Sequence, residues 1–275
     1  MSTAQVNGVT IYYELHGEGS TETVALLNGV MASASSWAYY TDLLTSRGYR
    51  VLLHDFRGQL LSEKPAGPYR FADHREDFLA LCRHLGIERC HLVGTSYGGE
   101  MAMRIALDAP GLVQSLVLID SVSELDALLE RFVNSWIDLA ETGDVRLFYR
   151  SVVPSLYSRS FLEQNAEMID GREARMAELP GDYLRGQAEL YRAFLADVPM
   201  TGELPGIRAP ALVVCGEEDI LKPTHFSRII AEGIPEAALI TLPDCGHVAV
   251  FEKPAELASL ITGFLGGIVE GSTKD

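Results

Sequence analysis

Short, almost wholly apolar runs recur along the chain, with amphipathic stretches between them. The runs are four or five residues long and rich in Val, Leu and Ile, as in strands buried on both faces; they cover residues 23–27, 50–54, 90–93, 115–119, 211–215 and 238–242. Apolar residues at helical spacing predict helices over residues 36–46, 71–85, 97–108, 223–230 and 254–265. This alternation predicts an α/β fold, in which helices cover both faces of a parallel sheet.

Two further strands are expected near the amino terminus. Asn7-Gly8 lies between β-prone runs at residues 4–6 and 9–13, and Asn-Gly is a strong signal for a two-residue hairpin. These two strands are therefore predicted to be antiparallel. Together with the six apolar runs they predict a mostly parallel sheet of eight strands.

The alternation stops between residues 121 and 206, where only helical periodicity is found. Ser121-x-x-Glu124 has the pattern of a capping box that opens a helix. Two stripes of apolar residues at helical spacing follow, and most of their side chains would form the segment's own core. The stripes are Leu125, Leu128, Leu129, Phe132 and Trp136, and then Leu184, Ala188, Tyr191 and Leu195. Because this segment follows a strand end, we expect residues 121–206 to form a helical lid over the carboxyl edge of the sheet. Residues 1–120 and 207–275 would form the core domain.

Composition and charge narrow the range of partners. Hydrophobic residues make up 47% of the 275, which suffices for a large core, and the net charge of −16 argues against nucleic acid or an anionic membrane as a partner. The first residues lack the basic and apolar regions of a signal peptide, and no apolar run reaches membrane-spanning length, so a cytoplasmic location is expected. Both a monomer and a homodimer are compatible with the sequence.

The four cysteines show neither the spacing of a disulfide framework nor that of a zinc site. Cys215 and Cys245 follow neighbouring predicted strands and could meet. Buried free thiols are the simpler expectation for all four.

Gly94-Thr95-Ser96-Tyr97-Gly98 joins a predicted strand to the helix after it and has the G-x-S-x-G pattern of a nucleophile elbow. A serine on so tight a turn has a strained backbone, and a side chain two residues before or after it would collide, which accounts for both glycines. The turn exposes the Ser96 hydroxyl and aims the Tyr97 N–H, at a helix amino terminus, at a developing oxyanion. A glycine-rich turn without chemistry is the alternative, but the flanking strand and helix favour a catalytic serine.

A serine nucleophile needs a general base, and the base needs an orienting acid. His247 follows the last predicted strand and Asp219 follows the strand before it. Loops after parallel strands share one edge of the sheet, so Ser96, Asp219 and His247 are predicted to meet there.

Other residues compete for these two roles. His54 and His225 also lie near the carboxyl edge, whereas the remaining histidines are expected to be surface or hydrogen-bonded residues: His16, His74, His84 and His91. Asp120 ends the strand after the elbow unit and is the main competitor of Asp219. The other nearby acids are interpreted as solvated loop charges: Glu217, Glu218 and Asp244.

Four stretches combine glycines with polar residues at fixed spacing. They are Leu92-Val93-Gly94-Thr95-Ser96-Tyr97-Gly98-Gly99, Asp55-Phe56-Arg57-Gly58-x-x-x-Ser62, Gly216-Glu217-Glu218-Asp219-x-x-x-Pro223 and Cys245-Gly246-His247-x-x-x-x-Glu252-x-Pro254. With these motifs the chain resembles the α/β-hydrolase superfamily, and within it the lid-bearing esterases, lactonases (enol-lactonases among them) and carbon–carbon-bond hydrolases. The resemblance covers almost the whole chain outside the lid.

The resemblance implies a role for each of these residues. Ser96 would be the nucleophile, His247 the general base and Asp219 its orienting acid. The N–H groups of Val30 and Tyr97 would hold the oxyanion. The family's chemistry implies no metal and no organic cofactor.

Two positions depart from the family's usual pattern. Asn28-Gly29 stands where the family usually has His-Gly; that histidine shapes the oxyanion loop through hydrogen bonds, which an asparagine can also make. Leu60 stands where the family often has glycine, and its bulk would alter that turn and the pocket wall. A serine at position 96, rather than an aspartate, excludes the chemistry of the haloalkane dehalogenases.

The sequence thus predicts a serine hydrolase that cleaves a carboxylic ester or lactone of a small molecule through an acyl-enzyme. Hydrolysis of carbon–carbon bonds in ring-cleavage products would use the same residues, and a ligand receptor with slow turnover is the alternative of another class. The aromatic residues of the lid suggest an apolar or aromatic substrate: Phe132, Trp136, Phe148, Tyr149, Tyr157, Phe161, Tyr183, Tyr191 and Phe194.

Overall fold

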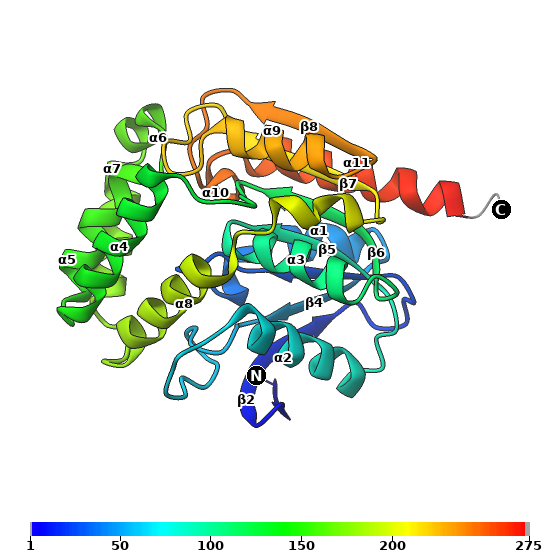
Figure 1. Ribbon diagram of the computed structural model, residues 1–275, viewed down its shortest axis with the longest axis horizontal. Coiled ribbons are helices and arrows are strands. Elements are labelled where there is room, and N and C mark those ends of the chain that lie inside the picture. Colours follow the sequence, from blue (N-terminus) through cyan, green and yellow to red (C-terminus); the bar gives the residue numbers. More distant parts are fainter. Residues whose placement is uncertain (1, 273–275) are drawn as a thin grey trace.

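Eight strands form one sheet in the computed structural model, which describes residues 2–272 (Figure 1). Their order across the sheet is β1-β2-β4-β3-β5-β6-β7-β8. Strands β1 and β2 are antiparallel to each other, as are β2 and β4, and every other neighbouring pair is parallel. The predicted mostly parallel sheet is therefore confirmed. The strands are β1 (Ser2–Val6), β2 (Val9–His16), β3 (Thr23–Leu27), β4 (Arg50–His54), β5 (Cys90–Thr95), β6 (Val113–Ile119), β7 (Ala211–Gly216) and β8 (Ala237–Leu242).

The antiparallel edge begins with the predicted hairpin. Asn7 and Gly8 both have positive φ, 46° and 78°, as the tight turn between β1 and β2 requires. The Asn7 amide also donates a 2.9 Å hydrogen bond to Asp77 on the neighbouring helix, α2 (Phe71–His84). The turn is thus fastened to the layer of helices beside it.

Alternate side chains along the central strands pack into two different cores. In β3, Val24 and Leu26 face the core under α1, α10 and α11, whereas Ala25 and Leu27 face the core under α2, α3 and α9. Because side chains alternate along a strand, burial on both faces requires a run that is apolar at every position. These covering helices are α1 (Ala38–Ser46), α3 (Tyr97–Asp108), α9 (Thr224–Gly233), α10 (Ala249–Glu252) and α11 (Pro254–Ser272).

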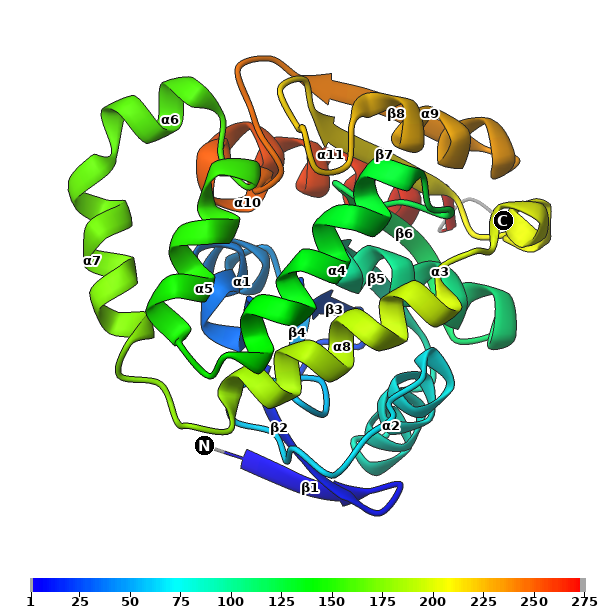
Figure 2. The same cartoon turned by 60° about the vertical axis from the view of Figure 1, so that its left-hand side comes forward.

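A helical insertion joins β6 to β7. Its helices gather at one end of the sheet, on the left of Figure 1, and α4, α5 and α8 lie in front of the strands when that side is turned forward (Figure 2). Helices α4 and α8 pack along each other, with the rings of Trp136 and Tyr191 5.5 Å apart. The insertion comprises α4 (Ala127–Glu141), α5 (Val145–Val152), η2 (Val153–Ser155), α6 (Arg159–Gln164), α7 (Ala166–Met176), α8 (Tyr183–Asp197) and η3 (Thr201–Gly206).

The predicted capping box at Ser121 and Glu124 is wrong. Helix α4 begins at Ala127, and the Asp126 side chain accepts a 2.7 Å hydrogen bond from the N–H of Leu129. The Ser121 hydroxyl instead donates to the carbonyl of Ile119 at the end of β6. The nearby sheet edge offers Ser121 a partner that the local pattern cannot reveal.

Two smaller sequence-based expectations differ from the structure, and a third is confirmed. Leu128, placed on the apolar stripe of α4, is 56% exposed, because the helix turns its Leu129 and Val133 side inward. Helix α11 continues through Gly271 and Ser272, where a loose tail was expected; residues 273–275 of that expected tail lie outside the described residues. All four cysteines are buried and free, as predicted. None of the helices within residues 2–272 has the length and apolar character needed to cross a membrane.

Candidate active site

Ser96 sits on a strained turn between β5 and α3. Its φ of 51° and ψ of −121° lie where residues other than glycine rarely occur. A Cβ atom on Gly94 would lie 2.3 Å from the carbonyl oxygen of Gly98, and one on Gly98 would lie 2.1 Å from that of Leu27. Both glycines of the elbow are therefore required by close backbone contacts, as the sequence pattern predicts.

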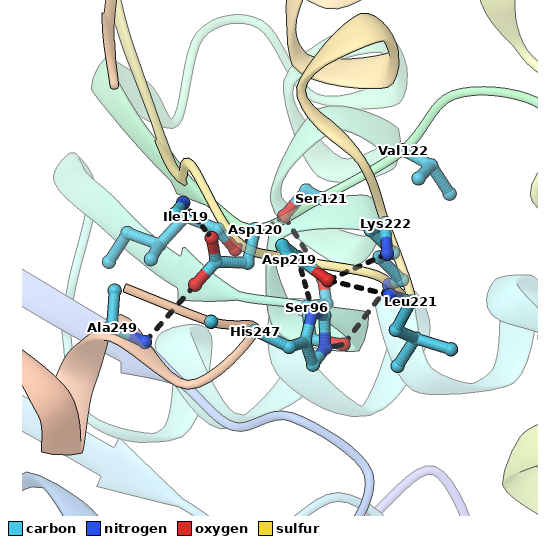
Figure 3. A network of polar contacts seen from close by, with 12 residues as sticks. Ser96, Ile119, Asp120, Ser121, Val122, Asp219, Leu221, Lys222, His247 and Ala249 are labelled. Atoms are coloured by element: carbon cyan, nitrogen blue, oxygen red, sulfur yellow. Dashed lines mark hydrogen bonds and ion pairs between the residues drawn. The ribbon is translucent and has the colours of Figure 1, made fainter. Parts of the chain in front are cut away.

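The structure brings Ser96, His247 and Asp219 together (Figure 3). The Ser96 Oγ lies 3.0 Å from His247 Nε2, and His247 Nδ1 lies 2.8 Å from Asp219 Oδ2. The other Asp219 oxygen, Oδ1, accepts hydrogen bonds from the N–H groups of Leu221 (2.9 Å) and Lys222 (2.8 Å). The backbone N–H of His247 donates to the carbonyl of Leu156 in the insertion, at 2.9 Å. Backbone contacts thus fix the Asp219 carboxylate and the main chain of His247, and the carboxylate orients the imidazole.

Asp120 does not reach the imidazole. Its two carboxylate oxygens accept hydrogen bonds from the N–H groups of Gly216 (2.9 Å) and Ala249 (3.3 Å), and Ala249 lies on the side of Asp120 away from Ser96 (Figure 3). Burial, followed by the nearby charge of Asp219, raises the pKa of Asp120 well above its usual value. Asp120 therefore joins two loops of the site, while Asp219 faces His247.

The other candidate acids and histidines lie elsewhere. Glu217, Glu218 and Asp244 are exposed, as expected of loop charges. His225 is half exposed on the surface, 3.8 Å from Asp126. The His54 ring packs against the rings of Phe56 and Phe78, and neither of its nitrogens has a hydrogen-bond partner among the described residues.

The expectation that His74 is a surface or hydrogen-bonded residue is wrong. Its ring is fully buried edge-on against Phe56 and Tyr97, and within residues 2–272 neither ring nitrogen has a partner. Burial lowers the pKa of His54 to about 4; burial, with the charge of Arg57, lowers that of His74 to about 3. Both rings are therefore neutral at neutral pH.

Two backbone N–H groups are candidates for the oxyanion hole, that of Val30 in the loop after β3 and that of Tyr97 at the start of α3. Within residues 2–272, no protein acceptor hydrogen-bonds to the N–H of Val30 or of Tyr97. The loop is held from behind by Gln59, whose amide donates to the carbonyls of Gly29 (2.7 Å) and Val30 (3.1 Å). Asn28 in turn donates to the Gln59 side chain at 3.1 Å. Val30, Tyr97 and Ser96 line the same cavity, so both N–H groups are available to a ligand there.

Asn28 does make the local hydrogen bonds expected of it. Its amide donates to the carbonyl of His54 (2.9 Å) and to Asp55, and its carbonyl accepts from the indole N–H of Trp37 at 2.9 Å. Leu60 lines the cavity in front of Ser96, as predicted for the pocket wall.

Lys222 and Glu100 also belong to this site, and sequence reasoning missed both. The Lys222 ammonium lies 3.0 Å from Ser96 Oγ and 2.9 Å from Glu100 Oε1, which also accepts from the N–H of Val122. Lys222 is 3% exposed and Glu100 fully buried. Burial raises the pKa of Glu100, while Lys222 acts in the opposite direction. The available signal was a lysine in the apolar stretch after Asp219 and a glutamate in the buried first turn of α3.

A cavity of about 520 Å³ opens in front of Ser96, between the sheet edge and the insertion. Ser96, His247, Glu100 and Lys222 lie on its wall, which is otherwise mostly apolar. Five of the nine aromatic residues named from the sequence line it: Trp136, Tyr149, Tyr157, Tyr191 and Phe194. The insertion also contributes Arg172 and Arg175 from α7.

Comparison with known proteins identifies the family. A family model described as alpha/beta hydrolase fold matches residues 22–254. The chain belongs to the α/β-hydrolase family. The sequence-based expectation of this fold is confirmed.

Relatives within the family are named as hydrolases of different substrates. The chain is 30% identical over 260 residues to "Putative carbamate hydrolase RutD" of Variovorax paradoxus, covering 93% of this chain and 96% of that protein. The enol-lactonase from Burkholderia xenovorans superposes with a TM-score of 0.88 at 25% identity, over 96% of this chain and 100% of that one. MGS-M2, an α/β-hydrolase enzyme from a deep-sea metagenome library of the Medee basin, superposes with a TM-score of 0.91 at 27% identity, over 96% and 97%. The chain is a hydrolase of the α/β-hydrolase fold.

Proposed function

We propose that the protein is a serine hydrolase that cleaves a carboxylic ester or lactone of a small molecule through an acyl-enzyme. The observation that carries the proposal is the chain of contacts from Ser96 Oγ to His247 Nε2 (3.0 Å) and from His247 Nδ1 to Asp219 Oδ2 (2.8 Å). Both distances are those of a nucleophile paired with its base and of a base paired with its orienting acid.

The first step is attack on the acyl carbon. The Ser96 hydroxyl gives its proton to His247 as its oxygen bonds to that carbon, and Asp219 stabilises the imidazolium that forms. The N–H groups of Val30 and Tyr97, two residues that line the cavity with Ser96, donate to the oxyanion that develops on the substrate. His247 then protonates the departing alcohol, or the alkoxide end of an opened lactone.

The second step is hydrolysis of the acyl-enzyme. Water gives a proton to His247 and attacks the same carbon. The bond to Ser96 Oγ breaks, and His247 returns the proton to the serine. Residues 121–206 act as the lid over this chemistry, because apolar side chains from this segment line the cavity in front of Ser96.

The substrate we propose is small and carries an apolar or aromatic group. Five aromatic side chains of the lid line the cavity, and its volume of about 520 Å³ is within the range typical of small-molecule sites. A carbamate is the second candidate bond, because the chain is 30% identical to a protein named for carbamate hydrolysis. The same three residues would then form a carbamoyl-serine in place of an acyl-serine.

A substrate panel tests the proposal. The panel contains p-nitrophenyl acetate, butyrate and benzoate, an aliphatic and an aromatic lactone, a p-nitrophenyl carbamate and a ring-cleavage dienone. Wild type is compared with Ser96→Ala and with Ser259→Ala, which alters an exposed serine of α11 outside the cavity wall.

We expect ester or lactone hydrolysis that Ser96→Ala lowers by about 10⁴-fold and Ser259→Ala leaves near the wild-type rate. Equal turnover in wild type and Ser96→Ala would contradict the proposal. Turnover of the dienone alone would show a carbon–carbon-bond hydrolase instead. Tight binding with no turnover of any compound would show a receptor.

A further inference from the structure

A buried ion pair touches the oxygen of Ser96. Lys222 lies in the loop after β7, three positions beyond Asp219, and Glu100 lies on the first turn of α3, four positions beyond Ser96. The Lys222 ammonium lies between Ser96 and Glu100, at 3.0 Å from Ser96 Oγ and 2.9 Å from Glu100 Oε1. Although both side chains are buried, both line the cavity in which the reaction would occur.

We propose that Lys222 is a fourth catalytic group, whose ammonium stabilises negative charge on Ser96 Oγ while the bond to the acyl carbon forms and breaks. This inference rests on the function proposed for Ser96 above. It assigns the oxygen of the nucleophile its own hydrogen-bond donor, separate from the two N–H groups proposed to bind the oxyanion of the substrate.

The first argument is the direction of the serine proton. A lysine ammonium donates hydrogen bonds and cannot accept one, so in the 3.0 Å contact it donates to Ser96 Oγ. The single proton of the hydroxyl is then left to point at His247 Nε2, which is an acceptor when Nδ1–H donates to Asp219. Lys222 therefore holds the hydroxyl in the orientation needed for proton transfer.

The second argument is charge. A cation beside Ser96 Oγ, on a side chain that is itself buried, favours the state in which that oxygen is negative. Glu100 offsets this charge, so the pair adds little net charge that would oppose protonation of His247. Glu100 is itself fixed by the N–H of Val122, at 2.9 Å, and the Lys222 ammonium also lies 4.9 Å from the centre of the Phe194 ring.

The geometry serves both halves of the reaction. During acylation Ser96 Oγ gives its proton to His247 and bonds to the acyl carbon; during deacylation that bond breaks and Oγ takes the proton back from His247. Lys222 keeps its three protons throughout and donates to Oγ whenever this oxygen carries charge. Loss of the ammonium should therefore slow both steps, by about 100-fold each, the size found for loss of one donor to an oxyanion.

The test replaces both charges at once. Lys222→Met alone would leave a buried carboxylate without a counterion, which is strongly destabilising. The main variant is therefore Lys222→Met with Glu100→Gln. A second variant, Lys222→Met with Glu100→Leu, replaces the pair by apolar side chains, an exchange that proteins often accept without loss of stability. Lys253→Met, at a position outside the cavity wall, is the matched control.

Stopped-flow rates of acylation and deacylation with p-nitrophenyl acetate are measured on variants that retain a cooperative thermal transition. We expect both rates to fall by about 100-fold in whichever double variant is folded, and to stay within about threefold of wild type in Lys253→Met. Rates within about threefold of wild type in a folded double variant would overturn the role of Lys222.

Ser96→Ala is measured in the same series. If it keeps the wild-type rate, the proposed function itself fails. If it is inactive while the folded double variants are fully active, only the role of Lys222 fails.

Discussion

His247 Nε2 lies 3.0 Å from Ser96 Oγ, although 151 positions separate the two residues in the chain. The contact exists because both residues follow parallel strands, β5 and β8, whose carboxyl ends lie at the same edge of one sheet. Strain at Ser96 and backbone hydrogen bonds to His247 and Asp219 fix the geometry before any substrate arrives.

Asp219, and not Asp120, is expected to support catalysis. Asp219→Asn keeps the shape of the side chain but removes the carboxylate that stabilises the imidazolium and sets its tautomer, so kcat should fall by about 10³- to 10⁴-fold with little change in stability. Asp120→Asn is the matched control and should lower Tm while keeping kcat within about tenfold of wild type, because its partners are the N–H groups of Gly216 and Ala249. Steady-state kinetics and thermal unfolding of both variants make the comparison. The opposite ranking of the two kcat values would assign the acid to Asp120.

The elbow should tolerate no side chain at Gly98. A Cβ there would lie 2.1 Å from the carbonyl oxygen of Leu27, so Gly98→Ala must displace β3 or α3. We expect loss of activity together with a Tm lowered by several degrees, as for other backbone clashes costing about 1–3 kcal/mol. Gly111→Ala is the control, since a Cβ at Gly111 has open space around it. Normal activity in Gly98→Ala would show that the turn is looser than the structure indicates.

The amide of Gln59 should matter through the loop that it holds. Gln59→Glu replaces the donor that binds the carbonyls of Gly29 and Val30 by a carboxylate oxygen, which repels them. The N–H of Val30 would then lose its position, and kcat should fall by about tenfold or more while KM changes less. Gln164→Glu, on the exposed end of α6, controls for the added charge. A wild-type kcat in Gln59→Glu would remove the loop from the mechanism.

Acid should destabilise the protein through two buried histidines. Their pKa values are lowered in the folded state, to about 4 for His54 and about 3 for His74, from the 6.5 of an ordinary histidine. The stability tied to each neutral ring is present above pH 6.5 and is lost as the pH falls toward those values, because only the unfolded chain binds the proton. Each ring should contribute a slope of about 1.4 kcal/mol per pH unit over this interval.

Urea unfolding between pH 7 and pH 5 measures that slope. The two histidines together account for part of the unfolding free energy that is lost in acid, and His74→Leu should remove about half of that part. His84→Leu, at an exposed position, should leave the loss unchanged. An unchanged slope in His74→Leu would mean that the ring is accessible to protons in the folded state.

Patterns of local sequence were enough to predict the strands and the elbow. Apolar runs marked each buried strand, and Gly94 and Gly98 flanked Ser96 because the turn leaves no room for a side chain. The meeting of Ser96 with His247 and Asp219 followed from the rule that loops after parallel strands share one edge.

Other features depend on neighbours that are distant in the sequence. Lys222 and Glu100 sit 122 positions apart, and each alone resembles a charged residue at the start of a helix or in a loop. Ser121 fitted a capping pattern but bonds to the end of β6 instead, and His74 fitted an amphipathic helix although its ring is buried among aromatic side chains. In each case the decisive partner comes from another element of the fold.

Whether Ser96 carries the acyl group is the central question. Wild type is mixed with p-nitrophenyl acetate, quenched in acid within the first turnover, digested and analysed by mass spectrometry, with Ser96→Ala treated in parallel. The account predicts an acetyl group on Ser96 in wild type, formed at the rate of the p-nitrophenol burst and absent from Ser96→Ala. Turnover of the ester without any acylation of Ser96, or an acetylated intermediate at another residue, would contradict it.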